Sequence, residues 1–262
     1  MQFASPFDGM LYAALGINAE LVIDHAWGWE PTEIKTIKSY KPETNSISSG
    51  QVLMEPYEFD KAKLIVKKMT ELLALDLVRK GVVTKKIVLT IGYDRESIKC
   101  VYKGKSIKDS VFTVVKTGKH YNGTVVSDHY GRPVPKYAHG TGNLSCWTSS
   151  TRRIMEVMMG LYDKIVDPDL LVRRVTVVAV NLLHEDDIPE EAPEQLDLFT
   201  DYAALEKKKA AEAAADDREK RLQKATLLLQ AKYGKNAVLK GMNLSEGGTT
   251  KLRNEQIGGH KA

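Results

Sequence analysis

Hydrophobic positions repeat at helical spacing in two segments of the chain. In residues 59–77 they recur every three or four positions until Gly81, which predicts one long helix. A second helix is predicted after Ser149-Ser150-Thr151, because Ser and Thr side chains cap helix N-termini and the apolar positions of residues 154–165 then form one stripe. Both predicted helices are amphipathic, so each needs an apolar surface to cover.

Other segments have the composition of strands. Residues 87–93 alternate between apolar and more polar positions, and residues 171–183 are the most β-branched part of the chain. Strands are also predicted at residues 46–55 and around 143–148, with one more, Val111–Val115, inside a long insertion. The order β-α-β-β-α-β predicts an α+β fold in which two helices cover one face of a four-stranded sheet and leave the other face free.

The flanking segments differ in character from this domain. Residues 9–28 predict one or two short helices, broken at Gly16-Ile17-Asn18, and 202–233 predict a long, mostly solvated helix because they contain no Pro or Gly. The division that follows is a helical N-terminal part (1–30), a linker (31–45), the α+β domain (46–184, with the insertion 95–138), an acidic linker (185–201), and a helical and then loosely ordered tail (202–262).

Composition excludes several classes of protein. Hydrophobic residues make up 43% of the 262 and charged residues 27%, which is typical of a soluble globular chain. No apolar run reaches the roughly 20 residues of a membrane helix, and the N-terminus lacks the features of a signal peptide. The two cysteines provide neither a disulfide framework nor a four-thiolate zinc site. We therefore expect a cytoplasmic protein with no membrane partner.

Charge is distributed unevenly. Residues 184–201 hold eight acidic residues and no Lys or Arg, so the rest of this +4 chain carries a net +12. Residues 84–120 alone carry +6. This pattern favours a polyanionic partner, although an ordinary lysine-rich surface gives the same signal.

Residue types that contact phosphates lie near the ends of the predicted elements. Such contacts position a nucleic acid without reading its sequence. A helix N-terminus adds free N–H groups that favour an anion. The candidates are Ser46, Ser48 and Ser49 before Gly50, Lys85 and Lys86, Arg152 and Arg153 at the start of the second helix, and Arg173 and Arg174 at the start of the last strand.

A short apolar motif, Gln195-Leu196-Asp197-Leu198-Phe199, interrupts the acidic linker. In an extended peptide, Leu196, Leu198 and Phe199 can fill apolar pockets of a partner while Gln195 donates a directed hydrogen bond. The alternative is that the motif packs back on its own domain.

No catalytic or metal-binding constellation is evident. The close acidic pairs Asp94/Glu96, Asp167/Asp169 and Asp186/Asp187 read as carboxylates of turns and solvated loops. The six histidines show no metal-ligand spacing, and no P-loop or Gly-x-Ser-x-Gly motif is present. We expect no catalytic residue, metal or cofactor in this chain.

The residues as a set resemble the C-terminal portion of bacterial Y-family translesion DNA polymerases. Residues 11–28 are similar to the end of the thumb domain, and Lys41–Gly50, Lys85–Asp94, Tyr137–Asn143, Thr148–Thr151 and Val166–Arg174 are similar to parts of the little finger domain. Gln195–Phe199 resembles the family's sliding-clamp-binding peptide, and residues 233–262 resemble tails of its polymerase IV/V-like Gram-positive branch. The family's palm and fingers, which carry its three metal-binding carboxylates, have no counterpart here.

The resemblance implies a role in DNA repair, damage tolerance and the SOS response. It implies primer-template DNA, the sliding clamp and the missing palm and fingers as partners, and it adds Thr148, Ser149 and Ser150 to the DNA-contacting residues. Mg²⁺ is expected only with the palm, so this chain alone is not expected to polymerise DNA. Two other hypotheses stay open: an interaction protein that binds only the clamp, and RNA binding through the basic insertion, although the aromatic residues there lack stacking-motif spacing.

Overall fold

The computed structural model describes residues 6–40, 45–189, 202–241, 250–254, 256–257 and 260–261. The chain divides into two compact units between Thr44 and Asn45. In the first unit, α1 (Pro6–Leu15) and α2 (Asn18–Ala26) are separated at Gly16, whose positive φ of 59° suits glycine. A third helix, α3 (Ile34–Ser39), lies within the residues expected to form a linker.

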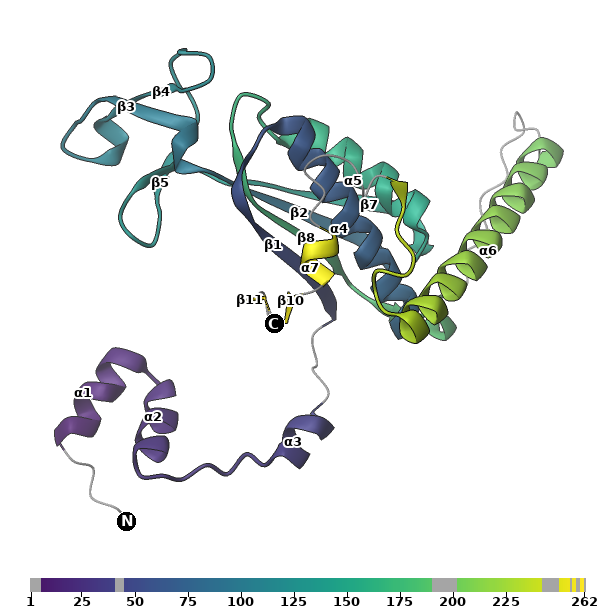
Figure 1. The fold of residues 1–262 in the computed structure, drawn as a ribbon, viewed down its shortest axis with the longest axis horizontal. Helices are drawn as coiled ribbons and strands as arrows, with labels where there is room; N and C mark the ends of the chain where they lie inside the picture. The colour runs from purple at the N-terminus through teal and green to yellow at the C-terminus, as the bar shows by residue number, and fades with distance from the viewer. Residues whose placement is uncertain are drawn as a thin grey trace. The chain divides into compact units, whose positions relative to one another are not determined.

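The second unit is built on an antiparallel sheet. Its strand order is β1 (Ser46–Tyr57), β8 (Val172–Val180), β2 (Val82–Tyr93) and β7 (Ala138–Thr148), and the short β9 (Leu183–His184) pairs with the start of β2. Helix α4 (Phe59–Lys80) connects β1 to β2, and α5 (Thr151–Ile165) connects β7 to β8 (Figure 1). The predicted α+β class and the β-α-β-β-α-β order are therefore confirmed.

Helices α4 and α5 cover one face of this sheet and enclose the main core with it. The fully buried core side chains include Ile65, Met69 and Leu73 from α4, Ile154 and Met158 from α5, Ile87, Leu89 and Ile91 from β2, and Val175 and Val177 from β8. Gly81 ends α4 in the left-handed conformation, with φ of 64°, as its position after the periodic stretch predicted.

Two glycines of β7 let α5 approach the sheet closely. A Cβ atom on Gly142 would lie 2.6 Å from Val157 Cγ1, and one on Gly140 would lie 2.9 Å from Leu161 Cδ1. The sheet surface beneath α5 is therefore fitted to the side chains of that helix.

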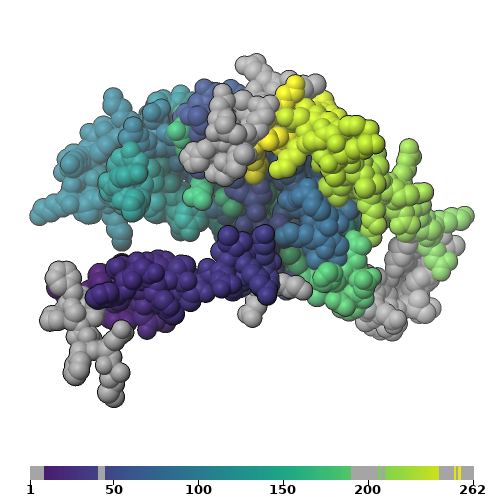
Figure 2. All heavy atoms as spheres, turned by 60° about the horizontal axis from the view of Figure 1, so that its bottom comes forward, coloured from purple at the N-terminus to yellow at the C-terminus, as the bar shows by residue number. Residues whose placement is uncertain are grey.

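The insertion between β2 and β7 has a small core of its own. It contains β3 (Ile98–Tyr102), β4 (Val111–Val114), β5 (Val125–Ser127) and β6 (Pro133–Pro135), of which only β4 was predicted. Ile98, Phe112 and Val114 pack with Leu170, which precedes β8. Figures 1 and 2 show the insertion, in teal, and α6, in green to yellow, at opposite ends of the second unit.

The C-terminal part contains α6 (Tyr202–Tyr233), α7 (Thr250–Asn254) and the pair β10 (Gln256–Ile257) and β11 (His260–Lys261). The bounds of α6 agree with the predicted long helix. Among the described residues, no helix has the length and apolar character needed to cross a bilayer.

Candidate nucleic-acid interface

The uncovered face of the sheet is defined by strand register. Residues directly opposite one another on paired strands lie on the same face, and alternate residues lie on opposite faces. Three rows of the open face are Ser46–Val180–Lys86–Asn143, Ser48–Val178–Val88–Thr141 and Gly50–Thr176–Thr90–His139. The residues between these rows, such as Ile47, Ile87 and Ala179, belong to or pack against the core.

This open face is mainly small and polar. Serine, threonine and glycine dominate its rows, and Val88, Val178 and Val180 are only half-buried. Thr90 Oγ1 and His139 Nδ1 are 2.9 Å apart and share a hydrogen bond. Short side chains leave the backbone accessible to a broad ligand, and hydroxyl groups supply hydrogen bonds to phosphate oxygens.

The serines of β1 do not share one side. Ser46 and Ser48 lie in rows of the open face, whereas Ser49 is opposite Val177 in a row that faces the helices. There the Ser49 hydroxyl accepts a hydrogen bond of 2.9 Å from Arg253 Nη2 of α7. The structure therefore separates Ser49 from the two serines with which it was grouped.

Lys85 and Lys86 lie at one end of the open face. The register of β2 against β7 shifts between Thr84 and Lys86, and the buried Thr84 hydroxyl donates to the carbonyls of Lys86 and Val180, at 2.8 and 2.7 Å. Lys85 is exposed and Lys86 half-buried. Hydrogen bonds of the Thr84 hydroxyl thus stabilise the irregularity in β2. The ammonium groups of Lys85 and Lys86 lie beside it and are accessible.

Thr148, Ser149 and Ser150 are buried immediately before α5, and Ser150 is its N-cap. Thr148 Oγ1 accepts from the Ser150 N–H at 3.0 Å, and Ser150 Oγ accepts from the Arg153 N–H at 3.3 Å. Of the three N-cap candidates, Ser149, Ser150 and Thr151, the structure shows that Ser150 is the N-cap. The Thr148 and Ser150 hydroxyls thus accept hydrogen bonds from backbone N–H groups at the start of α5, at residues predicted to contact DNA.

Arg152 and Arg153 pair with carboxylates of α6. Arg152 Nη2 lies 3.0 Å from Asp216 Oδ1, and Arg153 contacts Asp216 at 2.9 Å and Glu212 at 3.2 Å. The hydrogen bond with Asp216 is the main cause that raises the pKa of the Arg153 guanidinium above its usual value. Both arginines therefore already hold an anionic partner.

Arg173 and Arg174 lie at the opposite end of the open face. Arg174 and Val180 are six positions apart along β8, which corresponds to about 20 Å of strand. Arg173 Nη1 donates to the Met54 carbonyl at 3.1 Å, while Arg174 is exposed. The predicted basic residues therefore form two groups, one at each end of the sheet.

The insertion extends the site beyond these arginines. A cavity of about 770 Å³ lies between the β5–β6 hairpin and the open face, and its lining includes Arg95, Arg132, Tyr137, Arg173 and Arg174. Arg132 is paired with Asp128 at 2.7 Å, which lowers the pKa of that carboxyl. In the sequence, only the basic charge of residues 84–120 indicated that the insertion contributes to the site. That charge did not identify Arg132 or Tyr137.

Gln195–Phe199, the predicted clamp-binding peptide, lies outside the described residues. The described residues contain no group of three or more His, Cys, Asp or Glu side chains that could hold a metal ion. The described residues therefore do not provide the cluster of carboxylates that would hold the Mg²⁺ of a polymerase reaction.

The fold is therefore an α+β domain whose sheet has one open face, with basic residues at both ends of that face. Residues 44–198 match the family model of the impB/mucB/samB family C-terminal domain. The chain belongs to this family. The predicted resemblance to the C-terminal portion of Y-family polymerases is thereby confirmed. No curated protein matches the chain significantly.

Two solved structures show weak likeness to the chain. One is an insertion ternary complex of Dbh DNA polymerase, with 12% identity and a TM-score of 0.32, covering 67% of this chain and 38% of that chain. The other is a complex of the beta-clamp processivity factor and the little finger domain of PolIV, with 8% identity and a TM-score of 0.32, covering 59% of this chain and 99% of that chain. The chain thus spans little more than a third of the Dbh polymerase chain, and the family assignment rests on the family model.

Proposed function

We propose that the open sheet face binds duplex DNA at a primer-template junction, as the DNA-holding part of a translesion polymerase. The observation that carries this proposal is the face itself: rows of short polar side chains, with Lys85 and Lys86 at one end and Arg173 and Arg174 at the other. The two basic groups are about 20 Å apart along the strands, which exceeds the roughly 12 Å width of a major groove. The two basic groups can therefore contact phosphates on both sides of that groove.

Backbone contacts suit damage tolerance. Phosphate contacts carry no direct sequence information, so a damaged base leaves most of the recognised surface unchanged. The open face offers hydroxyls and ammonium groups for phosphates, in agreement with this mode of binding. Polymerisation itself requires a cluster of metal-binding carboxylates, and the described residues contain no such cluster.

The experiment is a salt titration of binding to a fluorescent primer-template duplex, followed by fluorescence anisotropy. Lys85→Ala/Lys86→Ala should weaken binding and reduce the slope of log K against log salt by about 1 to 2, because each lost phosphate contact removes about one unit. The matched control is Lys67→Ala/Lys164→Ala, two lysines of α4 and α5 on the other side of the sheet. Equal effects of the two pairs would refute the open face as the DNA site.

We also propose that Gln195–Phe199 binds the sliding clamp. The support is its sequence: three apolar side chains in an acidic linker. Leu198→Ala/Phe199→Ala should abolish binding to the clamp and leave binding to duplex DNA unchanged. Clamp binding without any DNA binding would favour the interaction-protein hypothesis, and a preference for single-stranded RNA would favour the RNA-binding one.

A further inference from the structure

The start of α5 is an anion-binding surface, and carboxylates of α6 occupy it. Glu219 Oε1 accepts from the Arg152 N–H at 3.0 Å, and Glu219 Oε2 accepts from Ser150 Oγ at 2.6 Å. Asp216 bridges the Arg152 and Arg153 guanidinium groups, and Glu212 adds a second contact to Arg153. Three carboxylates therefore fill the positions at which the sequence predicts phosphate contacts.

The chemistry of this surface does not distinguish a carboxylate from a phosphate. Arginine forms bidentate hydrogen bonds to both groups, and free N–H groups at a helix start favour either anion. Glu212, Asp216 and Glu219 are spaced four and three residues apart, so they form one acidic line along α6. A DNA strand presents a comparable line of anionic oxygens.

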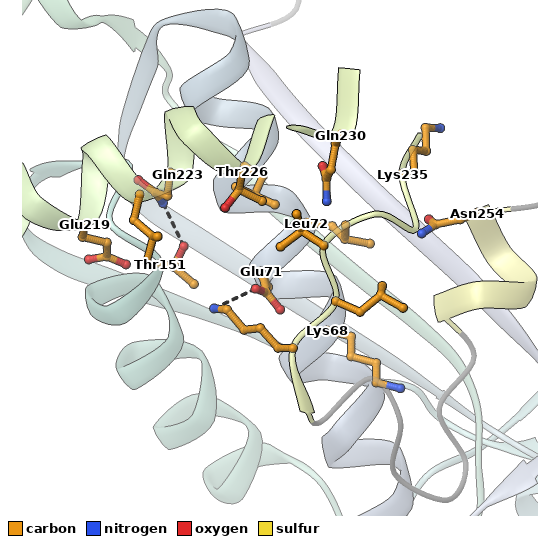
Figure 3. Close-up of a pocket in the computed structure, with 15 residues that line it drawn as sticks. Lys68, Glu71, Leu72, Thr151, Glu219, Gln223, Thr226, Gln230, Lys235 and Asn254 are labelled. Carbon is orange, nitrogen blue, oxygen red and sulfur yellow. Dashed lines mark hydrogen bonds and ion pairs between the residues drawn. The ribbon is translucent and has the colours of Figure 1, made fainter. Parts of the chain in front are cut away.

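The side-chain contacts between α6 and α5 are polar. Among the α6 residues whose side chains are described, none belongs to either hydrophobic cluster, and Leu222 and Leu228 are 66% and 72% exposed. Besides the carboxylates, Gln223 Nε2 donates to the Ser149 carbonyl and to Thr151 Oγ1, and Lys220 pairs with Glu185 (Figure 3 shows the Gln223–Thr151 bond). Partly exposed ion pairs contribute little each and weaken with salt, so α6 can leave without disturbing the core.

The location connects this surface to the DNA face. Thr148, two residues before the N-cap of α5, pairs with Thr84 of β2, immediately before Lys85 and Lys86. The arginines of α5 and the lysines of β2 therefore belong to the same end of the sheet. A duplex that contacts Lys85 and Lys86 has its backbone close to the surface that α6 covers.

We propose that α6 is a displaceable acidic cover, and that backbone phosphates of duplex DNA replace its carboxylates on Arg152, Arg153 and the start of α5. This inference rests on the proposed DNA-binding function. Because the cover is part of the same chain, it competes at a high effective concentration and lowers the apparent affinity for DNA. If α6 is displaced in about one molecule in ten, its removal tightens binding about tenfold.

The test compares variants of the full chain on the fluorescent primer-template duplex. Asp216→Asn/Glu219→Gln should bind DNA about tenfold more tightly than the wild type. The control Glu206→Gln/Asp217→Asn neutralises two exposed charges on the same helix, so it reports the general effect of charge. Gln223→Ala releases α6 without any change of charge and should also tighten binding. Circular dichroism verifies that each variant is folded.

Two further measurements make the outcome decisive. In an Arg152→Ala/Arg153→Ala background the gain from Asp216→Asn/Glu219→Gln should disappear, because the two pairs act through one contact. Hydrogen exchange of the α6 amides should become faster when the duplex is saturating.

The proposal would be overturned if the gain in DNA affinity were no larger than that of the control and hydrogen exchange in α6 were unchanged, because α6 would then stay bound to α5 permanently. In that case, DNA binding that still depends on Lys85 and Lys86 would leave the proposed function intact. Absence of DNA binding by the wild type and by every released variant at low salt would instead refute the proposed function, and the cover with it.

Discussion

At the scale of single residues, the close approach of α5 to β7 makes Gly142 a sensitive position. Alanine would place its Cβ 2.6 Å from Val157 Cγ1, a β-branched side chain with little freedom to move. We expect Gly142→Ala to lower the free energy of unfolding by about 1–3 kcal/mol, as overpacking of a core does. Urea unfolding measures this change.

The matched control is Gly160→Ala in α5 itself. No atom lies within 4 Å of a Cβ at this exposed helical position. Alanine is a better helix former than glycine, so this variant should gain about 0.5–1 kcal/mol. Destabilisation by both variants, or by neither, would contradict the packing of α5 on Gly142.

Lys68 of α4 has a buried ammonium group without a partner among the described residues. The residue is only 4% exposed, and its Nζ atom has no hydrogen-bond partner. Burial lowers the pKa of the ammonium group below its usual value. The folded protein thus binds this proton less tightly than the unfolded chain, so stability rises with pH between the lowered pKa and the ordinary one.

Replacing Lys68 with methionine should therefore stabilise the protein at neutral pH, by about 1–3 kcal/mol, because the cost of an unpaired buried polar group is removed. The gain should shrink at pH 10, where the wild-type lysine has lost part of its charge. Urea midpoints at the two pH values test this expectation. A gain that does not depend on pH would mean that the charge of Lys68 is compensated.

Residue placement followed from the sequence only where a periodic rule applied to it. The two-residue period of a strand places Ser46 and Ser48 on one face and Ser49 on the other. The sequence therefore contained the signal that separates them, although the three serines were grouped by composition. The burial of Lys68 had no such signal, because a lysine in an amphipathic helix is ordinarily solvated.

At the scale of elements, the insertion behaves as a separate small body. Its strands pack around Ile98, Phe112 and Val114, and this cluster is distinct from the main core. Its short strands were missed, apart from β4, because polar and glycine-rich hairpins show little alternation. Leu170, which completes their cluster, is more than fifty residues away in the sequence from Val114.

We expect the sheet to fold without the insertion. Residues 95–136 can be replaced by a four-residue Gly-Ser loop, since β2 and β7 are antiparallel neighbours and hairpin loops of two to five residues are common. Leu170→Ser would accompany the deletion, because this leucine loses its cover. Circular dichroism should show a folded protein with cooperative urea unfolding. Loss of cooperativity would show that the sheet depends on the insertion.

The long helix α6 was predicted from composition, but its docking was not. Its contacts with α5 join residues about sixty positions apart, through carboxylates that look solvated in the sequence. Charged residues at exposed-looking positions carry no periodic signal for a partner. The sequence predicted phosphate contacts for Arg152 and Arg153. In the structure their contacts are with carboxylates of α6, for which the sequence contained no signal.

At the scale of the whole molecule, the two units have separate sources of stability. Among the described residues, those that form or pack against the main core lie between Ile47 and Leu182, and none of them comes from α1, α2 or α3. A domain with its own core folds without its neighbour. We therefore expect residues 45–262 alone to unfold cooperatively, with the same denaturant midpoint as the full chain.

The same truncation also tests which unit holds DNA. All the basic residues assigned to the interface, from Lys85 to Arg174, lie in the second unit, so the 45–262 fragment should keep the salt slope of the full chain on the primer-template duplex. Residues 1–44 carry three lysines and no arginine, too few to replace that interface. A fragment that folds with an unchanged midpoint but loses most of its salt slope would place the main phosphate contacts in the N-terminal unit. Retention of both properties would assign DNA binding to the sheet domain and its C-terminal helix.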